Sequence, residues 1–179
     1  MRILVPTIDY PPIEGGIATI AVQLTRELAR RGHEVTVLAP ALAATNPQYA
    51  DVTAFDANEP VRVVRFPGYE RGWLRLFPLL RRGLPLAAET DLVLAVNLAY
   101  GGPLGFIARL RRGTPYVTFA YAYEFMKWNF FPARLLFGAL YRRSAACVAI
   151  SGFTRSRLAA FGVPPEHIAV VRPGASLPA

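Results

Sequence analysis

The sequence predicts an α/β fold built on a Rossmann-like, doubly wound and mainly parallel sheet of about seven strands, with helices on both faces. Short apolar runs alternate with segments of helical periodicity along the whole chain. Such continuous runs, separated by helices, are typical of parallel strands that are covered on both faces. Three predicted helices are also followed by a glycine where a left-handed cap favours one, at Gly32, Gly113 and Gly162.

The elements follow one another in a regular order. Strands are expected near residues 2–6, 34–39, 61–66, 91–96, 116–119, 145–150 and 168–172, and helices near 17–31, 72–82, 103–112, 133–143 and 152–161. In the first helix one apolar stripe contains Ile17, Ile20, Ala21, Leu24 and Leu28, which we expect in the core. The segment 40–60 is rich in Ala, Asn, Asp and Pro and is expected to be a loop over the rim of the sheet.

Length and composition indicate one globular domain. The chain has 179 residues, of which 53% are hydrophobic and 18% charged, so it can bury a sizeable core. Its formal net charge of +8 is carried almost wholly by arginine, with Lys127 as the only lysine. Such a surface suits phosphates or anionic lipid. Nucleic acid is not expected as a partner, because no recognised binding motif accompanies the charge.

The cellular context follows from cysteine usage and from the first residues. The single cysteine, Cys147, lies in the apolar run 145–150 and is expected to be a small buried residue rather than a reactive thiol. The absence of a disulfide framework suits a reducing compartment. The first apolar residues are too few for a signal peptide, and no apolar run approaches the roughly 20 residues that span a bilayer. We therefore expect a cytoplasmic protein, either soluble or peripheral at the inner face of the membrane.

The loop after the first strand is the most informative motif. Gly15 and Gly16 stand directly before the first helix, where exposed amides favour an anion and glycine allows close approach. The loop is longer than the Gly-x-Gly-x-x-Gly turn of dinucleotide-binding proteins, and the second strand ends in Ala39 and Pro40 rather than an acidic residue. P-loop, Gly-x-Ser-x-Gly and zinc-binding spacings are absent as well.

Polar side chains gather in the loops that follow the strands. Ligands of open α/β sheets bind beyond the carboxyl ends of the strands, and this mixture of aromatic, hydroxyl and amide groups suits a sugar or polyol. The expected substrate-binding residues are Gly15, Gly16, Tyr10, Asn97, Tyr123, Lys127, Ser151 and Arg155, and the candidates for catalysis are Tyr121 and Glu124. Asp9 and Glu14 are either solvated or bound to a hydroxyl group. Ser151 is either a plain helix cap or a ligand contact. No metal site is expected.

Several of these motifs resemble a known family. Tyr10-Pro11-Pro12 before the glycine pair, and the segment from Leu28 to Val37, look like the start of group 1, family 4-like glycosyltransferases of the GT-B fold. Further matches are Ser151-Gly152-Phe153-Thr154-Arg155, the segment from Gly162 to Ile168, and Val171-Arg172-Pro173-Gly174. The resemblance covers both ends of the chain well and residues 40–90 poorly.

The resemblance implies that residues 1–174 are the N-terminal, acceptor-binding half of a GT-B enzyme, that 175–179 begin an interdomain linker, and that the C-terminal donor-binding domain is absent from this chain. It further implies a retaining hexosyltransferase that uses a UDP- or GDP-type nucleotide sugar, a hydroxyl acceptor on a glycan or lipid, and no cofactor. The isolated chain would be inactive. Family members commonly have a His-Gly pair after the fifth strand, where this chain has Ala120 and Tyr121.

Two other functions remain open at the level of the sequence. One is a non-catalytic module that binds a sugar or nucleotide, motivated by the missing histidine, and the other is a GT-B-type sugar epimerase. In addition, segments 71–82 and 127–134 interleave Trp and Phe with basic residues. This pattern predicts weak, reversible binding to an anionic membrane, unless the aromatic rings instead cover the sheet.

Overall fold

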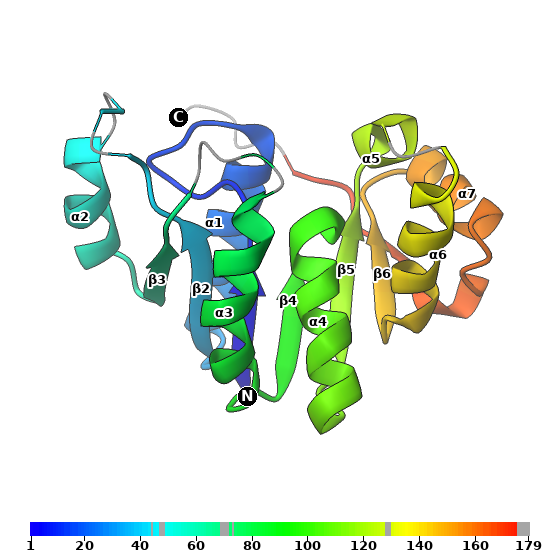
Figure 1. Cartoon of the computed structure of the whole chain (residues 1–179), viewed down its shortest axis with the longest axis horizontal. Helices are drawn as coiled ribbons and strands as arrows, with labels where there is room; N and C mark the ends of the chain where they lie inside the picture. The colour runs from blue at the N-terminus through cyan, green and yellow to red at the C-terminus, as the bar shows by residue number, and fades with distance from the viewer. Residues whose placement is uncertain (44, 47–48, 69–71, 73, 128–129, 175–179) are drawn as a thin grey trace.

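The computed structural model describes residues 1–43, 45–46, 49–68, 72, 74–127 and 130–174. The described residues form a seven-stranded sheet, which Figure 1 shows with the carboxyl ends of the strands at the top. Its strands are β1 (Arg2–Pro6), β2 (Glu34–Pro40), β3 (Arg62–Phe66), β4 (Leu92–Ala95), β5 (Tyr116–Ala120), β6 (Ala146–Ala149) and β7 (Ile168–Val170). All neighbouring strands pair in parallel, in the order β3-β2-β1-β4-β5-β6-β7. The predicted fold class is confirmed.

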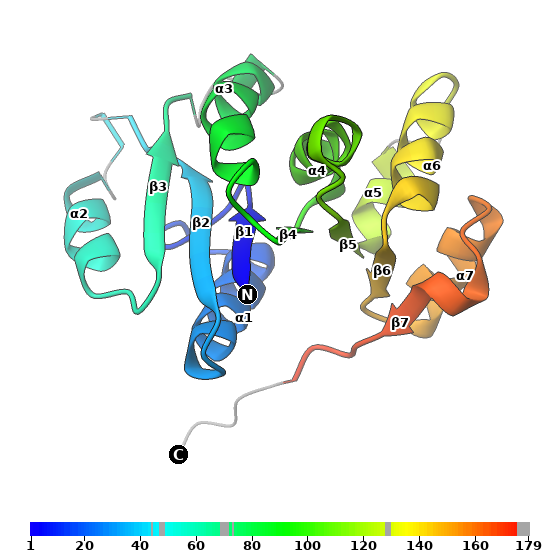
Figure 2. The ribbon, with the colours of Figure 1, turned by 90° about the horizontal axis from the view of Figure 1, so that it is seen from below.

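Helices cover the two faces of this sheet. They are α1 (Gly16–Arg30), α2 (Tyr49–Ala57), α3 (Leu76–Ala87), α4 (Leu98–Arg112), α5 (Ala122–Lys127), α6 (Ala133–Arg143) and α7 (Gly152–Ala160). Viewed along the strands in Figure 2, α1 lies on one face, while α3, α4 and α6 lie on the other. Ile3, Val5 and Val37 face α1, whereas Leu4 and Leu38 face α3 and α4, as the twofold alternation of a strand requires.

Four expectations about the elements were wrong. The predicted loop 40–60 contains helix α2, and the short helix α5 lies between the expected strand 116–119 and the expected helix 133–143, where no helix was predicted. Helix α3 occupies residues 76–87 instead of 72–82, and α4 begins at Leu98 instead of near 103. The run Gly101-Gly102-Pro103 is typical of a turn. In the structure, Gly101 lets α4 lie close to the sheet, because a Cβ there would stand 2.8 Å from the Cβ of Ala95.

The environment of Cys147 and the character of the helices can be compared with the predictions. Cys147 is fully buried in β6, as expected, and burial raises the pKa of its thiol to about 11. No helix in the described ranges combines the length and the apolar character needed to cross a membrane. The proposed linker residues 175–179 lie outside the described part of the chain.

The strand order reverses direction between β1 and β4. Loops from neighbouring strands then lead to opposite faces of the sheet, which opens a crevice at the carboxyl ends of these strands. The glycine loop follows β1, and Asn97 follows β4. The topology therefore brings two parts of the predicted site to this switch point.

Candidate functional site

Two buried polar side chains mark the carboxyl ends of β4 and β5. Asn97 is 6% exposed and occupies the N-cap position of α4, yet its side chain makes no capping hydrogen bond. Tyr121 is 8% exposed, and its ring stacks on Phe119 with centroids 6.5 Å apart. Within the described part of the chain, neither Asn97 Oδ1 nor the Tyr121 hydroxyl has a hydrogen-bond partner. Such buried polar atoms are costly when unsatisfied, so they point to a ligand with hydroxyl groups.

Glu124 fixes these two residues relative to each other. Its Oε1 accepts a hydrogen bond from the Leu98 amide at 3.1 Å, and its Oε2 accepts from the Tyr121 amide at 3.3 Å and from the Tyr141 hydroxyl at 2.9 Å. The carboxylate thus joins the start of α4, the end of β5 and helix α6. Burial raises the pKa of Glu124 to about 7, and the three hydrogen bonds offset only part of this rise.

The glycine pair is exposed at the mouth of α1. A Cβ added to Gly15 or Gly16 would meet no atom within 4 Å, so packing within this domain does not require glycine at either position. No side chain caps α1, and its first turn contains no acidic residue. The helix start therefore presents backbone amides that can receive an anion. Gly16 also lines a mostly apolar groove of about 710 Å³ between α1 and residues 171–174.

Tyr10 has a structural role instead of a place at this surface. Its side chain is fully buried, and its hydroxyl is 3.2 Å from both Thr25 Oγ1 and Glu59 Oε2. Arg65 also holds this loop, because it donates a hydrogen bond to the Pro11 carbonyl at 2.6 Å. The ring belongs to the core under the loop, so Tyr10 does not present a surface for the substrate contact expected from the sequence.

After β6, Ser151 is the N-cap residue of α7 and Arg155 lies in the first turn of this helix. The Ser151 hydroxyl accepts from the Thr154 amide at 3.2 Å, while Thr154 Oγ1 accepts from the Ser151 amide at 3.0 Å. This reciprocal pair is a capping box, which supports the helix-cap alternative for Ser151. Arg155 is exposed and lines a separate hollow of about 320 Å³ with Pro165 and Ile168. Neither residue belongs to the switch point between β1 and β4.

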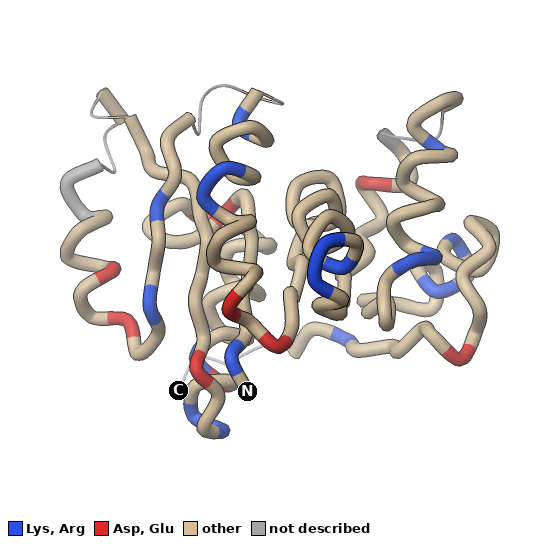
Figure 3. The backbone as a smooth tube through the Cα atoms, turned by 60° about the horizontal axis from the view of Figure 1, so that its bottom comes forward, with Lys and Arg blue, Asp and Glu red and all other residues tan. Residues whose placement is uncertain are grey.

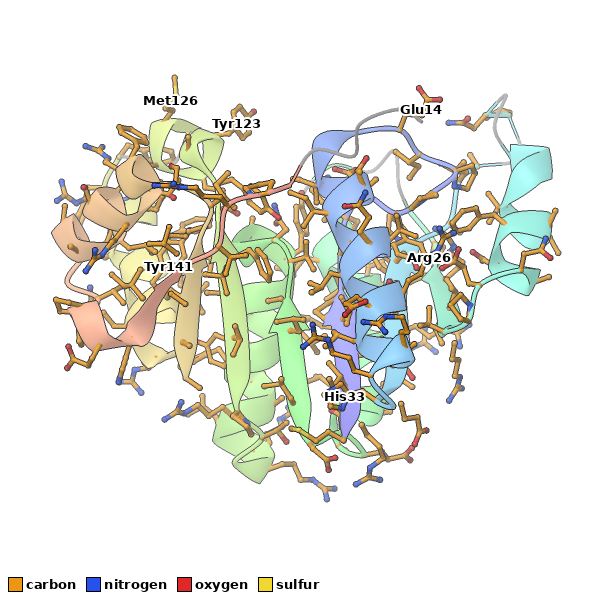
Figure 4. All side chains as sticks on the ribbon, turned by 180° about the vertical axis from the view of Figure 1, so that it is seen from behind. Glu14, Arg26, His33, Tyr123, Met126 and Tyr141 are labelled. Carbon is orange, nitrogen blue, oxygen red and sulfur yellow. The ribbon has the colours of Figure 1, made fainter. Side chains whose placement is uncertain are left out.

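The remaining predicted residues lie on α5. Tyr123 is 65% exposed, and Figure 4 shows it projecting away from the body of the molecule. Lys127 ends the same helix, and its side chain lies outside the described part of the chain. Of the predicted residues, the structure thus gathers Gly15, Gly16 and Asn97 around the switch point, with Tyr121 directly after the adjoining strand β5 and Glu124 on α5.

Arg75 is a site residue that no pattern in the sequence indicated. Arg75 precedes α3, and its guanidinium lies over the ring of Tyr100 in the first turn of α4, 4.5 Å from the ring centroid. It also acts on Asp9, which follows β1: burial raises the pKa of Asp9, and the charge of Arg75 opposes this rise. No spacing in the sequence connects these residues. Only the packing of α3 beside α4 brings the cation to the switch point.

The fold is that of a Rossmann-like α/β domain of the GT-B type. The family model of Glycosyltransferase Family 4 matches residues 14–177, nearly the whole chain. The chain belongs to this family. A comparison with curated protein sequences gives no match.

Solved structures support the same fold. HepE from Anabaena, in complex with UDP-glucose, matches with a TM-score of 0.71 and 20% identity over 98% of this chain and 44% of its own. Sucrose-phosphate synthase from Thermosynechococcus elongatus matches with a TM-score of 0.74 and 13% identity, over 97% and 48%. UDP-GlcNAc 2-epimerase from Neisseria meningitidis, bound to UDP-GlcNAc, has a TM-score of 0.58 and 12% identity over 95% and 45%. The chain spans less than half the length of each protein.

Proposed function

We propose that this chain is the acceptor-binding half of a retaining hexosyltransferase. The complete enzyme transfers a sugar from a UDP- or GDP-type donor to a hydroxyl group of a glycan or lipid-linked acceptor, and it uses no resident cofactor. A C-terminal domain supplies most of the donor site, so the chain alone is inactive. Membership of Glycosyltransferase Family 4 supports the reaction class, and the bound UDP-glucose of HepE supports the type of donor.

The main support for this proposal is a pair of buried polar atoms at the ends of β4 and β5 that have no hydrogen-bond partner among the described residues. Asn97 Oδ1 can only accept a hydrogen bond, and the Tyr121 hydroxyl can donate or accept. A sugar or polyol supplies hydroxyl groups that match both. Because each side chain is more than nine-tenths buried, its orientation is fixed before the ligand arrives.

In this proposal the chain binds and orients the acceptor and provides no strong base. Burial and the neighbouring Glu124 raise the pKa of Tyr121 above its usual value, so the phenol stays protonated at neutral pH. The Glu124 carboxylate is 5% exposed and already accepts three hydrogen bonds. We therefore assign Glu124 to positioning, and assign activation of the sugar to the donor-binding domain.

The donor phosphates would approach the exposed start of α1. Gly15 and Gly16 leave the space above them open, and the uncapped amides of the helix favour negative charge. Arg75 adds a cation at the same edge of the sheet, beside Asp9. The arrangement suits the charge of a nucleoside diphosphate.

Paired variants of two buried tyrosines test this assignment in the full-length protein. Tyr121→Phe removes a hydroxyl with no partner in the described structure, so we expect unchanged stability and about a tenfold rise in acceptor KM. Tyr10→Phe removes a hydroxyl bonded to Thr25 and Glu59, so we expect a loss of about 1 kcal/mol in unfolding free energy and unchanged KM. Urea unfolding and nucleoside diphosphate release from UDP- and GDP-sugars measure these effects. Equal KM values for wild type and Tyr121→Phe would remove Tyr121 from the acceptor site.

The structural similarity to epimerases supports a second candidate activity, the epimerisation of a nucleotide sugar. The matched enzyme from Neisseria meningitidis is an epimerase with UDP-GlcNAc bound, and its TM-score is lower than those of the two glycosyltransferase-type matches. Incubation of the full-length protein with nucleotide sugars but without acceptor separates the reactions. An epimerised product identifies an epimerase, a product with retained anomeric configuration on an added acceptor identifies the transferase, and binding without turnover identifies a non-catalytic module.

A further inference from the structure

Large apolar side chains are exposed at the corner formed by α5, residues 130–132 and the start of α6. Their exposed fractions run from 53% to 80%, and the residues are Tyr123, Met126, Phe130, Phe131, Leu135 and Leu136, here called the corner patch. Tyr123 and Met126 are three residues apart on α5, so they share one side of the helix. Figure 4 shows both projecting beyond the carboxyl edge of the sheet, the edge at which Glu14 also lies. An exposed apolar surface of this kind indicates a binding face.

The charges around the corner patch have one sign. Between Asp91 and Glu166 the sequence contains a single acidic residue, Glu124, and that carboxylate is buried. Basic residues recur throughout the same stretch, and Figure 3 shows them along α6 and α7. The ion pairs in the described part of the chain join residues between Arg2 and Asp91 only. The half of the molecule that carries the corner patch is therefore strongly electropositive.

We propose that the corner patch docks on an anionic lipid bilayer. A bilayer interface combines a continuous negative surface with an apolar layer just beneath it, which matches exposed Phe, Leu and Met side chains among arginines. Arg134 stands between Phe131 and Leu135 in the sequence and is itself exposed. A protein partner would have to supply many carboxylates around an apolar centre, whereas an anionic membrane supplies both without matching individual side chains.

Docking in this way would bring the acceptor site to the membrane. Helix α5 directly follows Tyr121 at the end of β5, and its Glu124 bonds to the start of α4 beside Asn97. The carboxyl edge of the sheet would then face the lipid surface, which fits a lipid-linked hydroxyl acceptor and a peripheral, cytoplasmic location. This consequence for the acceptor rests on the proposed function, while the docking itself does not.

Vesicle flotation with the purified chain tests the docking without any enzymatic readout. We expect binding to vesicles that contain phosphatidylglycerol, weaker binding at high salt, and little binding to pure phosphatidylcholine. The double variant Phe131→Ser/Leu135→Ser should lose about tenfold or more in apparent affinity. Arg134→Gln should weaken binding to the anionic vesicles by a few-fold, about fivefold.

The matched control is Leu110→Ser. Leu110 is 63% exposed on α4, near the opposite, amino-terminal edge of the sheet, so its loss should leave vesicle binding unchanged. Circular dichroism checks that each variant keeps its fold.

Equal binding of the double variant and the wild type, or equal binding to neutral and anionic vesicles, would overturn the proposal. Self-association that depends on Phe131, without vesicle binding, would assign the corner patch to a second copy of the chain. Loss of docking would leave the glycosyltransferase assignment intact, since turnover with soluble acceptors is measured separately.

Discussion

At the scale of single residues, burial separates structural groups from ligand-binding groups. Tyr10 and Tyr121 are both buried tyrosines in the same α1-side core, but only the Tyr10 hydroxyl is bonded to other described residues. Glu124 is the third informative residue, because it is a buried carboxylate held only by neutral donors. Its ionisation therefore costs free energy that no cation recovers.

Glu124 gives the chain a measurable pH dependence. The pKa rises from 4.5 in the unfolded chain to about 7 in the folded one, so the folded state binds the proton more tightly. The contribution of Glu124 to the free energy of unfolding is therefore largest below about pH 4.5, and it falls by about 3 kcal/mol as the pH rises from there through 7. Glu124→Gln should remove this fall. Urea unfolding of both proteins at about pH 5 and about pH 8 measures the difference in slope, and parallel slopes would contradict the prediction.

At the scale of elements, α4 illustrates how a sequence that is typical of a turn becomes a helix. Gly101 and Gly105 face the sheet, and a Cβ on Gly105 would stand 2.7 Å from the Cβ of Tyr116. Close contact between this helix and β4 and β5 positions the start of α4, where Asn97 and the Glu124 hydrogen bond lie. The helix packing therefore supports the candidate site directly.

Gly105→Ala should destabilise the chain although alanine favours helices. The new methyl group overlaps the Tyr116 side chain, and overpacking costs about 1–3 kcal/mol, which exceeds the helix-propensity gain of about 1 kcal/mol. Gly152→Ala on α7 is the matched control, because a Cβ there meets no atom within 4 Å. Thermal or urea unfolding should show a lower stability for Gly105→Ala and no loss for Gly152→Ala. If both variants were equally stable, the close packing of α4 would not limit the substitution.

At the scale of the whole molecule, the proposed function makes this chain one face of a larger binding site. Its switch point carries exposed glycines with open space above them, and proteins of similar fold are more than twice as long as the part they share with this chain. Under the proposed function, the donor and the second domain fill that space. Glycine at position 16 would then be required by the assembled enzyme and not by the folding of this chain.

Gly16→Ala separates these two requirements. The stability of the chain should stay within about 1 kcal/mol of the wild type, because the methyl group has room and the position begins a helix. Turnover of nucleotide sugars by the full-length protein should fall by about tenfold or more, since the methyl group displaces the donor phosphates. Gly152→Ala again serves as control. Unchanged turnover in Gly16→Ala would mean that no ligand approaches the backbone there.

Local patterns in the sequence determined the fold class. Apolar runs, helical stripes and the glycines after α1, α4 and α7 depend on neighbouring residues, so the parallel sheet and most of its elements followed from them. The amphipathic pattern of α2 is weak, so the segment 40–60 was wrongly predicted to be a loop. The glycines in the first turns of α4 are typical of a turn, so the start of this helix was predicted too late in the chain. The sequence also placed Asn97, Tyr121 and the glycine pair at the carboxyl edge, because that position depends only on where a strand ends.

Only the tertiary structure decided which polar groups are available to a ligand. The Tyr10 side chain is buried, the Ser151 hydroxyl caps α7, and Arg75, which precedes α3, lies at the switch point. Each outcome depends on contacts between segments far apart in the chain, which no local pattern encodes. The physical reason is that a hydroxyl or carboxylate has the same local preferences in either setting, while its burial and its hydrogen-bond partners are set by the packing of the whole domain.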